Sequence, residues 1–471
     1  MSTTSTTTTR EQTGAANSSI DLKSKPAEPA DAAGSTQPSS SEKPQAPTQP
    51  QFPDGGTKAW LVVLGCWCTS FASFGIVNSF GYLPTLIIHS LPSIPYITNT
   101  LPSSVYETYY HQTYLSHHSP SAIAWIGSLQ AFAQFSATLV SGPLTDRYGP
   151  LVVIWPMSLL LVAAMMLTSL CREYYQFLLC QGILLGLSCG LIFAPALSVV
   201  GHYFSRRRAM AMAYASTGSP IGGTVYPLIL TKLINSPDVG FPWAQRVCGF
   251  VSLFLLLVAA VTIRPVPSMQ RKGNPIVLEA FLNPAYSLQV AGLFLVVLGF
   301  WTPYFYLASY AQEHGMAPRL ASYLFAILNA GSFAGRMLGG TFAHRLGQFN
   351  VVTFSCYASA ILLFCWLRIT SSAGLIVFSV LFGAMSGIII ALMMSTMAQC
   401  APHPSQIGTY VGQSTFVIGF AGLAGTPVTG ALISGHKGYT QGIVFSGAVM
   451  MAGAVVFTFA RYAFARDKLV A

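Results

Sequence analysis

Apolar residues dominate the chain from Trp60 to Tyr462, in runs that are mostly about 20 residues long and are separated by short loops rich in Gly, Pro and charge. An α-helix rises about 1.5 Å per residue, so one such run can cross a hydrocarbon core roughly 30 Å thick. The pattern therefore predicts an all-α integral membrane protein with a lipid bilayer as its surroundings. Twelve membrane-spanning helices are expected, at 60–81, 120–141, 150–170, 176–200, 208–234, 243–264, 285–309, 319–342, 350–370, 372–399, 407–434 and 440–462.

Residues 1–53 break this pattern, because they are polar and rich in Ser, Thr, Pro and Gln. A segment of this composition cannot bury enough apolar surface to fold, so we predict a disordered cytosolic tail. Loop Lys and Arg are more numerous on the side that holds both termini, which is typical of the cytoplasmic face. We expect a multi-pass protein of the plasma membrane with both termini in the cytosol.

Composition narrows the function classes. Only 8% of the 471 residues are charged, whereas soluble proteins carry about a quarter. The net charge of +10 is scattered over short loops, which argues against nucleic-acid binding. The nine cysteines lack the paired spacing of a zinc site, and the sequence contains neither an HExxH motif nor an identifiable Ser, His and Asp constellation. We expect no metal, no cofactor and no enzymatic activity.

An internal repeat is visible in two places. The stretch Gly142-Pro-Leu-Thr-Asp146-Arg147-Tyr-Gly149 returns 198 residues later as Gly340-Thr-Phe-Ala-His344-Arg345-Leu-Gly347. A second echo pairs Gly218-Ser-Pro220-Ile-Gly222-Gly223 with Gly425-Thr-Pro427-Val-Thr-Gly430. Each echo joins predicted helices that are six apart along the chain.

Two six-helix halves of the same orientation follow from this spacing. We place them at 54–264 and 285–462, with a cytosolic linker at 265–284 and a cytosolic C-terminus at 463–471. Parallel repeats of this kind build carriers that work by alternating access, with the binding site between the halves near the middle of the membrane.

Three stretches resemble a known family. The first copy of the repeat resembles motif A of the major facilitator superfamily, a Gly-x-x-x-Asp-Arg-x-Gly loop. Two others are similar to the monocarboxylate porter family, in its fungal branch; they are Asp54-Gly55-Gly56 with Trp60, and Tyr203-Phe204-Ser-Arg206-Arg207. The resemblance covers roughly residues 54–462 and implies a secondary transporter for a small-molecule solute.

Residues 82–104 have no counterpart in the fungal pattern. Deleting them joins Gly81 to Val105 and gives a continuous stretch that looks like the family. We interpret this segment as a retained intron whose 23 codons preserve the reading frame. A genuine extracellular loop is the alternative.

Arg336 is the strongest candidate for the substrate site. It stands alone inside the eighth predicted helix, between Gly335 and Met337. A guanidinium at membrane depth costs several kcal/mol unless it faces the bundle interior, so such a residue is a functional candidate. It also matches the substrate-binding Arg that the resemblance implies for this helix. Its fork of N–H donors suits a carboxylate. The alternative is a structural Arg whose head reaches an interface.

The resemblance also shows departures from the family. Animal lactate carriers place a Lys in the first helix and an Asp one turn before this Arg, where the chain has Asn78 and Ser332. Proton coupling through such a pair therefore cannot be carried over, and a coupling proton stays open.

Other polar residues of the predicted helices have two interpretations each. Tyr304 belongs to an aromatic group in the seventh helix, which would line a cavity or form an interfacial belt. Gln181 and Gln413 are expected to face the bundle interior, either at the substrate site or in hydrogen bonds between helices. Both amides are included among the candidate binding residues.

Conformational roles are expected at the two repeated stretches. The resemblance implies that Asp146, Arg147 and Arg345 form a conformational latch, which we define as contacts that hold one arrangement of the two halves. His344 stands where the second copy should have an Asp. Gly218, Pro220, Gly222 and Gly223 should kink the fifth helix and let a neighbour approach closely. This stretch also resembles motif C of drug exporters.

Two cargo hypotheses follow for the expected carrier. Missing coupling residues and the aromatic seventh helix favour efflux of a secondary metabolite with an acidic group. Uptake of a monocarboxylate or a vitamin-type nutrient is the alternative. A membrane sensor that binds a metabolite without moving it is the alternative from another class.

The intron hypothesis predicts that mature messenger RNA lacks codons 82–104. Sequencing the transcript across this region measures it directly. Transcripts that all retain these codons would contradict the hypothesis and favour the loop.

Overall fold

The structure is a computed structural model that describes residues 54–79, 106, 109–118, 120–236, 238–264, 277–433 and 438–465. All regular secondary structure in these ranges is helical, as the sequence predicts. The expected tail at 1–53, the interpreted intron at 82–104 and most of the linker lie outside the described residues.

The helices before the linker form the first half. They are α1 (Thr57–Asn78), η3 (Tyr110–Tyr114), α3 (Pro120–Tyr148), α4 (Pro150–Thr168), α5 (Tyr174–Phe177), η4 (Leu178–Leu185), α6 (Gly186–Tyr203), α7 (Arg208–Ser216), α8 (Gly218–Ile234) and α9 (Gly240–Thr262).

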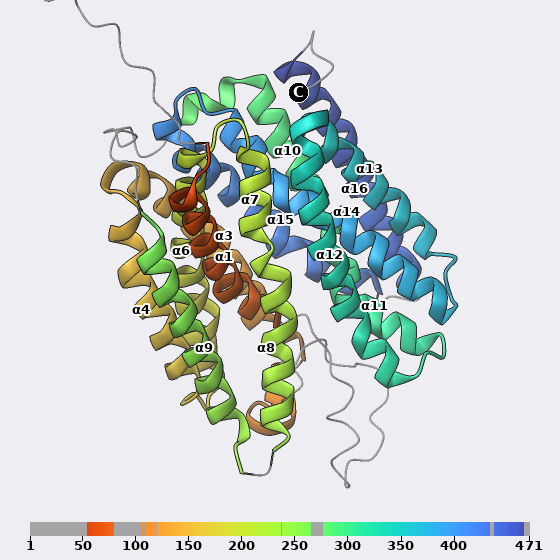
Figure 1. The fold of residues 1–471 in the computed structure, drawn as a ribbon. Helices are drawn as coiled ribbons and strands as arrows, with labels where there is room; N and C mark the ends of the chain where they lie inside the picture. The colour runs from red at the N-terminus through yellow and green to blue at the C-terminus, as the bar shows by residue number, and fades with distance from the viewer. Residues whose placement is uncertain are drawn as a thin grey trace, which may run out of the picture. The chain divides into compact units, whose positions relative to one another are not determined.

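The second half contains the helices from 278 onward. They are η6 (Leu278–Leu282), α10 (Pro284–Phe300), α11 (Thr302–Glu313), α12 (Pro318–Leu346), α13 (Gln348–Trp366), α14 (Ser372–Gln399), η7 (Pro404–Gln406), α15 (Ile407–Ile433) and α16 (Tyr439–Phe464). The start of α1 and the end of α16 lie at the same end of the bundle (Figure 1).

Every predicted span falls on a helical segment, and nine segments within the described ranges are long and apolar enough to cross a bilayer. The other three are α3, α12 and the pair α7 and α8, which is interrupted at Thr217. Both α3 and α12 carry polar side chains that are buried in the bundle, such as Gln130 and Asn329. These polar side chains lower the mean hydropathy of α3 and α12, although both helices pack among apolar neighbours.

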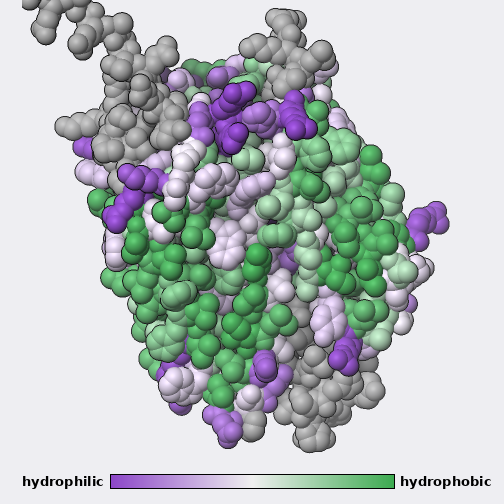
Figure 2. Space-filling model, viewed as in Figure 1, coloured by the Kyte–Doolittle hydropathy of each residue, from purple (hydrophilic) through white to green (hydrophobic). Residues whose placement is uncertain are grey.

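Apolar side chains cover the middle of the face that Figure 2 shows. Figure 2 shows hydrophobic residues over the central part of the visible face and hydrophilic residues gathered toward its two ends. The exposed large hydrophobic side chains of the described residues include Leu159, Phe254 and Phe354. Such a surface needs an apolar solvent, which the hydrocarbon of a bilayer supplies.

Small residues set how closely the helices pack, and they do so in the same way in both halves. A Cβ added at Gly190 of α6 would lie 1.9 Å from the carbonyl oxygen of Gln134 on α3. In the second half, a Cβ at Gly387 of α14 would lie 2.4 Å from the carbonyl oxygen of Ser332 on α12. Gln134 and Ser332 are 198 residues apart, as are the copies of the first repeat. The sequence repeat is therefore also a repeat of helix packing.

The last glycine of each repeated stretch ends a helix. Gly149 and Gly347 both adopt a φ of 87°, which favours glycine, and each separates two long helices. The stretches were expected as loops, but α3 continues to Tyr148 and α12 to Leu346. Asp146 and Arg345 therefore lie in the last turns of helices.

The two family stretches at Asp54 and Tyr203 meet in space. One carboxylate oxygen of Asp54 accepts hydrogen bonds from the backbone N–H groups of Ser205, at 2.6 Å, and Arg206, at 2.9 Å. The ring of Trp60 packs edge-on against Phe204 at 5.6 Å between centroids. Residues about 150 positions apart thus form one contact that fixes the start of α1 against the connection from α6 to α7.

The remaining members of these stretches serve the same junction. Gly55 and Gly56 carry the chain into α1 at φ values of 154° and 87°. The backbone N–H of Asp54 donates to the carbonyl of Tyr203 at 3.0 Å. Arg206 and Arg207 are exposed beyond the end of α6.

Gly190→Ala should destabilise the fold, because its new Cβ meets a backbone oxygen that cannot move independently of α3. We expect a loss of roughly 3 kcal/mol and a lower apparent melting temperature in detergent, followed by tryptophan fluorescence. Gly182→Ala is the matched control on the same face, because its nearest neighbour is the flexible Leu129 side chain at 3.3 Å. Equal melting temperatures for the two variants would contradict the packing argument.

Candidate functional site

A cavity lies between the two halves and is lined by side chains from α1, α3, α6, α7, α8, α10, α11, α12, α14 and α15. Most of the lining is apolar, with the aromatic residues Phe74, Phe135, Phe193, Phe300, Trp301 and Tyr304. Its polar residues are Asn78, Ser216, Ser219, Asn329 and Arg336. Among the side chains that line it there is one cation and no carboxylate. Such a cavity suits a largely apolar solute with an anionic group.

Arg336 is 3% exposed and contributes the positive charge of this cavity. One of its terminal nitrogens donates a hydrogen bond to the backbone carbonyl of Ser216, which lies in the other half. Its Nε is buried and has no hydrogen-bond partner among the described residues. The guanidinium therefore keeps donor capacity for a ligand, as the sequence hypothesis requires.

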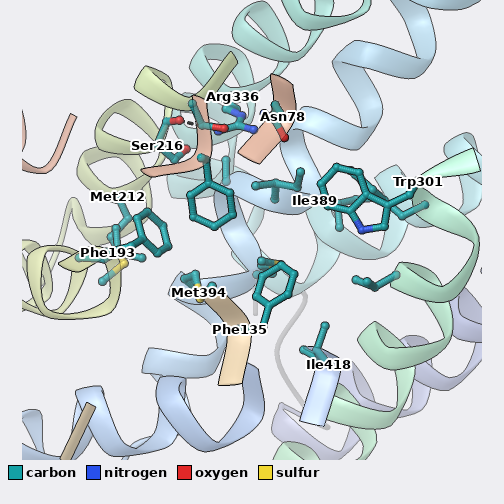
Figure 3. Close-up of a pocket in the computed structure, with 18 of the residues that line it drawn as sticks. Asn78, Phe135, Phe193, Met212, Ser216, Trp301, Arg336, Ile389, Met394 and Ile418 are labelled. Atoms are coloured by element: carbon teal, nitrogen blue, oxygen red, sulfur yellow. Dashed lines mark hydrogen bonds between the residues drawn. The ribbon is translucent and has the colours of Figure 1, made fainter. Parts of the chain in front are cut away.

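Two other predicted binding residues share this cavity. Figure 3 shows Arg336 close to both Ser216 and Asn78, on the side of the lining away from Ile418. Tyr304 is 8% exposed, and its hydroxyl lies 3.1 Å from that of Ser386. Of the two interpretations of the aromatic group, the structure therefore places Tyr304 in the cavity lining rather than in an interfacial belt.

Gln181 and Gln413 lie elsewhere. The Gln181 side-chain oxygen accepts a hydrogen bond from the Tyr110 hydroxyl within the first half. Gln413 donates to the backbone carbonyl of Val277 at 3.2 Å, beside the end of the linker. Neither residue belongs to the cavity lining. Gln181 therefore makes a hydrogen bond between helices, as its alternative interpretation expects, whereas the partner of Gln413 lies just before η6 and outside any helix.

Asn329 and the carbonyl of Ser216 are not among the binding groups that the sequence predicts. Asn329 lies on α12 two turns before Arg336, so both residues share one helix face. That seven-residue spacing of polar residues in an apolar helix was a usable signal. The backbone carbonyl of Ser216 has no side-chain signal, and only the approach of the two halves reveals it.

The glycines around Pro220 pack α8 against α1. A Cβ at Gly218 would lie 2.2 Å from the carbonyl oxygen of Trp67, and one at Gly222 would lie 2.5 Å from that of Phe71. Gly223 faces Asn78, whose side-chain nitrogen would be 3.0 Å from an added Cβ. The expected close approach is present, and the helical segment is interrupted one residue before Gly218.

Asp146 connects the two halves at one end of the cavity. Its carboxylate accepts hydrogen bonds from the backbone N–H of Gly408 at 3.2 Å, the N–H of Thr409 at 2.8 Å and the Thr409 hydroxyl at 2.9 Å. Gly408 and Thr409 lie in the first turn of α15, where N–H groups lack helical partners and the helix dipole favours an anion. The carboxylate is 5% exposed, so water competes little for these bonds.

The other two members of the expected latch differ from this arrangement. Arg147 is exposed, and its guanidinium lies over the ring of Tyr148 at 5.2 Å. Arg345 is also exposed, at the end of α12. In the described residues the contact between the halves is thus made by Asp146 and a helix N-terminus, and not by an ion pair between Asp146 and these arginines.

Further contacts between the halves cluster at the same end. A Cβ at Gly142 would lie 2.1 Å from the carbonyl oxygen of Gly408, and one at Gly340 would lie 2.5 Å from Cβ of Ala213. The hydroxyls of Tyr214 and Thr341 are 3.2 Å apart. The first glycine of each repeated stretch therefore permits equivalent close contacts. In Figure 1, α8 and α12 diverge toward the opposite end.

The cavity is not built to hold a metal. Its lining offers neither Cys, His nor a carboxylate, and no group of three such side chains among the described residues is placed to bind a metal ion.

Comparison with known proteins gives consistent findings. The family described as Major Facilitator Superfamily matches residues 65–426. The chain is 43% identical over 415 residues to the aspyridones efflux protein apdF of Emericella nidulans, covering 88% of this chain and 80% of that protein. It is 35% identical over 437 residues to the agnestins efflux protein AgnL12 of Paecilomyces divaricatus, covering 93% of each.

A solved structure is similar in fold. It is that of the human organic anion transporter MFSD10, with a TM-score of 0.63 and 16% sequence identity. The similarity covers 86% of this chain and all of the solved chain.

Asp146→Asn should loosen the contact between the halves. Hydrogen bonds to a charged group are worth about 1.5–3 kcal/mol each, so the bonds to Gly408 and Thr409 should weaken by several kcal/mol when the charge is removed. We expect backbone amides in 404–412 to exchange with deuterium at least about tenfold faster, measured by mass spectrometry on protein in nanodiscs. Asp238→Asn is the control, because Asp238 is exposed between α8 and α9. Unchanged exchange in Asp146→Asn would contradict the assignment.

Proposed function

Because this chain belongs to the Major Facilitator Superfamily, we propose that it exports a largely apolar secondary metabolite with an acidic group from a fungal cell. Family membership makes it a membrane transporter of small molecules and not an enzyme. Export and the chemistry of the cargo are the proposal. One observation carries it: a single buried guanidinium faces a cavity lined by six aromatic side chains.

The chemistry of the cavity supports such a cargo. Aromatic rings such as Phe193 and Trp301 offer flat apolar surface, which suits a conjugated ring system. Met212, Met393 and Met394 add flexible, polarizable side chains that adapt to different shapes. A short monocarboxylate would leave most of this apolar surface uncovered, so the lining favours the larger solute over the uptake alternative.

Arg336 is proposed to bind the acidic group. Water is scarce around a side chain that is 3% exposed, so a charge-assisted hydrogen bond there is stronger than at the surface. Asn78 and Asn329 would accept or donate further hydrogen bonds beside it. Tyr304 would contribute its ring to the apolar lining that contacts the solute.

The direction of transport is proposed from the relatives. Two similar proteins, from Emericella nidulans and Paecilomyces divaricatus, are named as efflux proteins for fungal metabolites. Placement in the plasma membrane with both termini in the cytosol would put the Asp146 end on the cytosolic side. The bonds from Asp146 to α15 would then form the latch that closes the cytosolic end, and they would break when the carrier opens there.

Two finer assignments belong to the same proposal. Membership of the monocarboxylate porter branch is supported by the contact between the Asp54 and Tyr203 stretches. A coupling proton would need a group outside the cavity lining, because the described lining contains neither a carboxylate nor an imidazole.

Counterflow in proteoliposomes tests the proposed cargo. A panel of aromatic carboxylic acids and phenolic pigments should show exchange only for apolar acids, and Arg336→Gln should lower the transport of those acids by at least about tenfold. Arg319→Gln is the matched control, because Arg319 lies on the same helix and is exposed. Full activity in Arg336→Gln would overturn the proposed site.

Export is tested separately in cells. Yeast cells that express the chain and are preloaded with the identified acid should lose it faster than cells with Arg336→Gln. Faster accumulation of external acid, with no change in loss, would favour uptake instead.

A further inference from the structure

Arg336 is held by a backbone carbonyl of the opposite half. The acceptor is Ser216, the last residue of α7, and its side chain also lines the cavity. Figure 3 shows this bond at the edge of the cavity. A carbonyl inside a regular helix already accepts from the N–H four residues later, so a further donor has to share it through its second lone pair.

Pro220 changes this for the Ser216 carbonyl. It is the residue four positions after Ser216, and proline has no N–H. The α-helical bond that would occupy the Ser216 carbonyl is therefore chemically impossible. The helical segment is interrupted at this place, where the N–H of Thr217 donates to Tyr214 at 3.1 Å instead. The carbonyl of Ser216 lacks this helical bond and accepts from Arg336.

The equivalent position in the first half shows the contrast. Thr138 and Arg336 are 198 residues apart, so they occupy matching places in the repeat. The hydroxyl of Thr138 also reaches across the halves: it lies 3.1 Å from the carbonyl oxygen of Gly412, although its shorter bond, at 2.6 Å, is to the carbonyl of Phe135 on its own helix. Phe416 lies four residues after Gly412 in α15 and has an N–H. The Thr138 hydroxyl therefore shares the Gly412 carbonyl with the helix. Of these two donors, only Arg336 has an acceptor carbonyl that a proline has released from its helical hydrogen bond.

We propose that Pro220 is a positioning residue for Arg336. By freeing the Ser216 carbonyl it gives the empty carrier a neutral acceptor for the guanidinium, and the acidic group of the solute replaces this acceptor on binding. Solute binding would then release one contact between the halves. The first step of this proposal is the release of the Ser216 carbonyl by Pro220. The second step, replacement of that carbonyl by the acidic group, rests on the proposed function of Arg336.

A rate of chemical labelling tests the first step without any solute. Phenylglyoxal reacts with arginine guanidinium groups, and mass spectrometry reports the modification at Arg336. Pro220→Ala supplies an N–H that competes for the Ser216 carbonyl, so labelling of Arg336 should be about tenfold faster than in the natural protein. The measurement uses the full chain in nanodiscs.

Pro227→Ala is the matched control. Pro227 lies inside the same helix, and the carbonyl that it frees belongs to Gly223 rather than to Ser216. Labelling of Arg336 in this variant should equal that in the natural protein. Pro220→Gly also supplies the N–H while keeping the helix flexible, so its Arg336 should be labelled as fast as in Pro220→Ala. It replaces the alanine variant in the test if that variant does not fold. Equal labelling in all variants, or equal acceleration by both proline sites, would overturn the proposal.

Protection by an added acid tests the second step. In the natural protein, 2-naphthoate should slow labelling of Arg336, whereas the neutral 2-naphthamide should not. In Pro220→Ala the new N–H competes with Arg336 for the Ser216 carbonyl, so the bond that the acid has to replace is weaker. The concentration of 2-naphthoate for half-protection should therefore fall about tenfold. An unchanged concentration would overturn replacement of the carbonyl. Equal protection by both compounds would instead contradict the proposed function of Arg336, while the proline comparison would still decide the first step.

Discussion

A positive charge buried in a membrane protein has to be compensated, and this requirement organises the centre of the molecule. Moving a guanidinium to the middle of a bilayer costs several kcal/mol unless it faces the bundle interior and finds hydrogen-bond acceptors. Arg336 satisfies the requirement only in part, through the carbonyl of Ser216. An incompletely compensated cation beside aromatic surface is well suited to bind an anion and to release it again, as transport requires.

Close helix packing makes this arrangement possible. Within a bilayer, helices gain little from excluding water, so they associate through small residues that let backbones approach. Gly190 and Gly387 do this at matching places within the halves, and Gly142 and Gly340 do it between them. Because these contacts repeat with the sequence, the same kind of close packing holds the helices together in both halves.

Hydrogen bonds between the halves accompany this close packing. Asp146 binds the first turn of α15, Thr138 binds the carbonyl of Gly412, and Arg336 binds the carbonyl of Ser216. Each bond uses a different kind of backbone group. Asp146 accepts from N–H groups at a helix N-terminus, Thr138 lies against a carbonyl that a helical N–H also uses, and Arg336 donates to the carbonyl that lacks a helical partner because of Pro220. Bonds of this kind are strong enough to favour one arrangement, and few enough to be broken by the binding of a solute.

The sequence by itself determined the membrane class and the helical spans, because the length and hydropathy of a segment decide whether it can cross a bilayer. It also determined the two-fold repeat, because matching residues return at a fixed spacing along the chain. It also made Arg336 the candidate for binding an acidic group, since a lone charge in an apolar helix is visible without coordinates. Tertiary structure decided the partners: it placed Asn78 and Tyr304 beside Arg336, excluded Gln181 and Gln413, and gave Asp146 a helix N-terminus instead of an arginine. Hydropathy cannot distinguish a polar side chain that faces a cavity from one bonded to a neighbouring helix, because both are buried. Backbone groups such as the Ser216 carbonyl are the same in every residue, so only the approach of the two halves shows which of them bind.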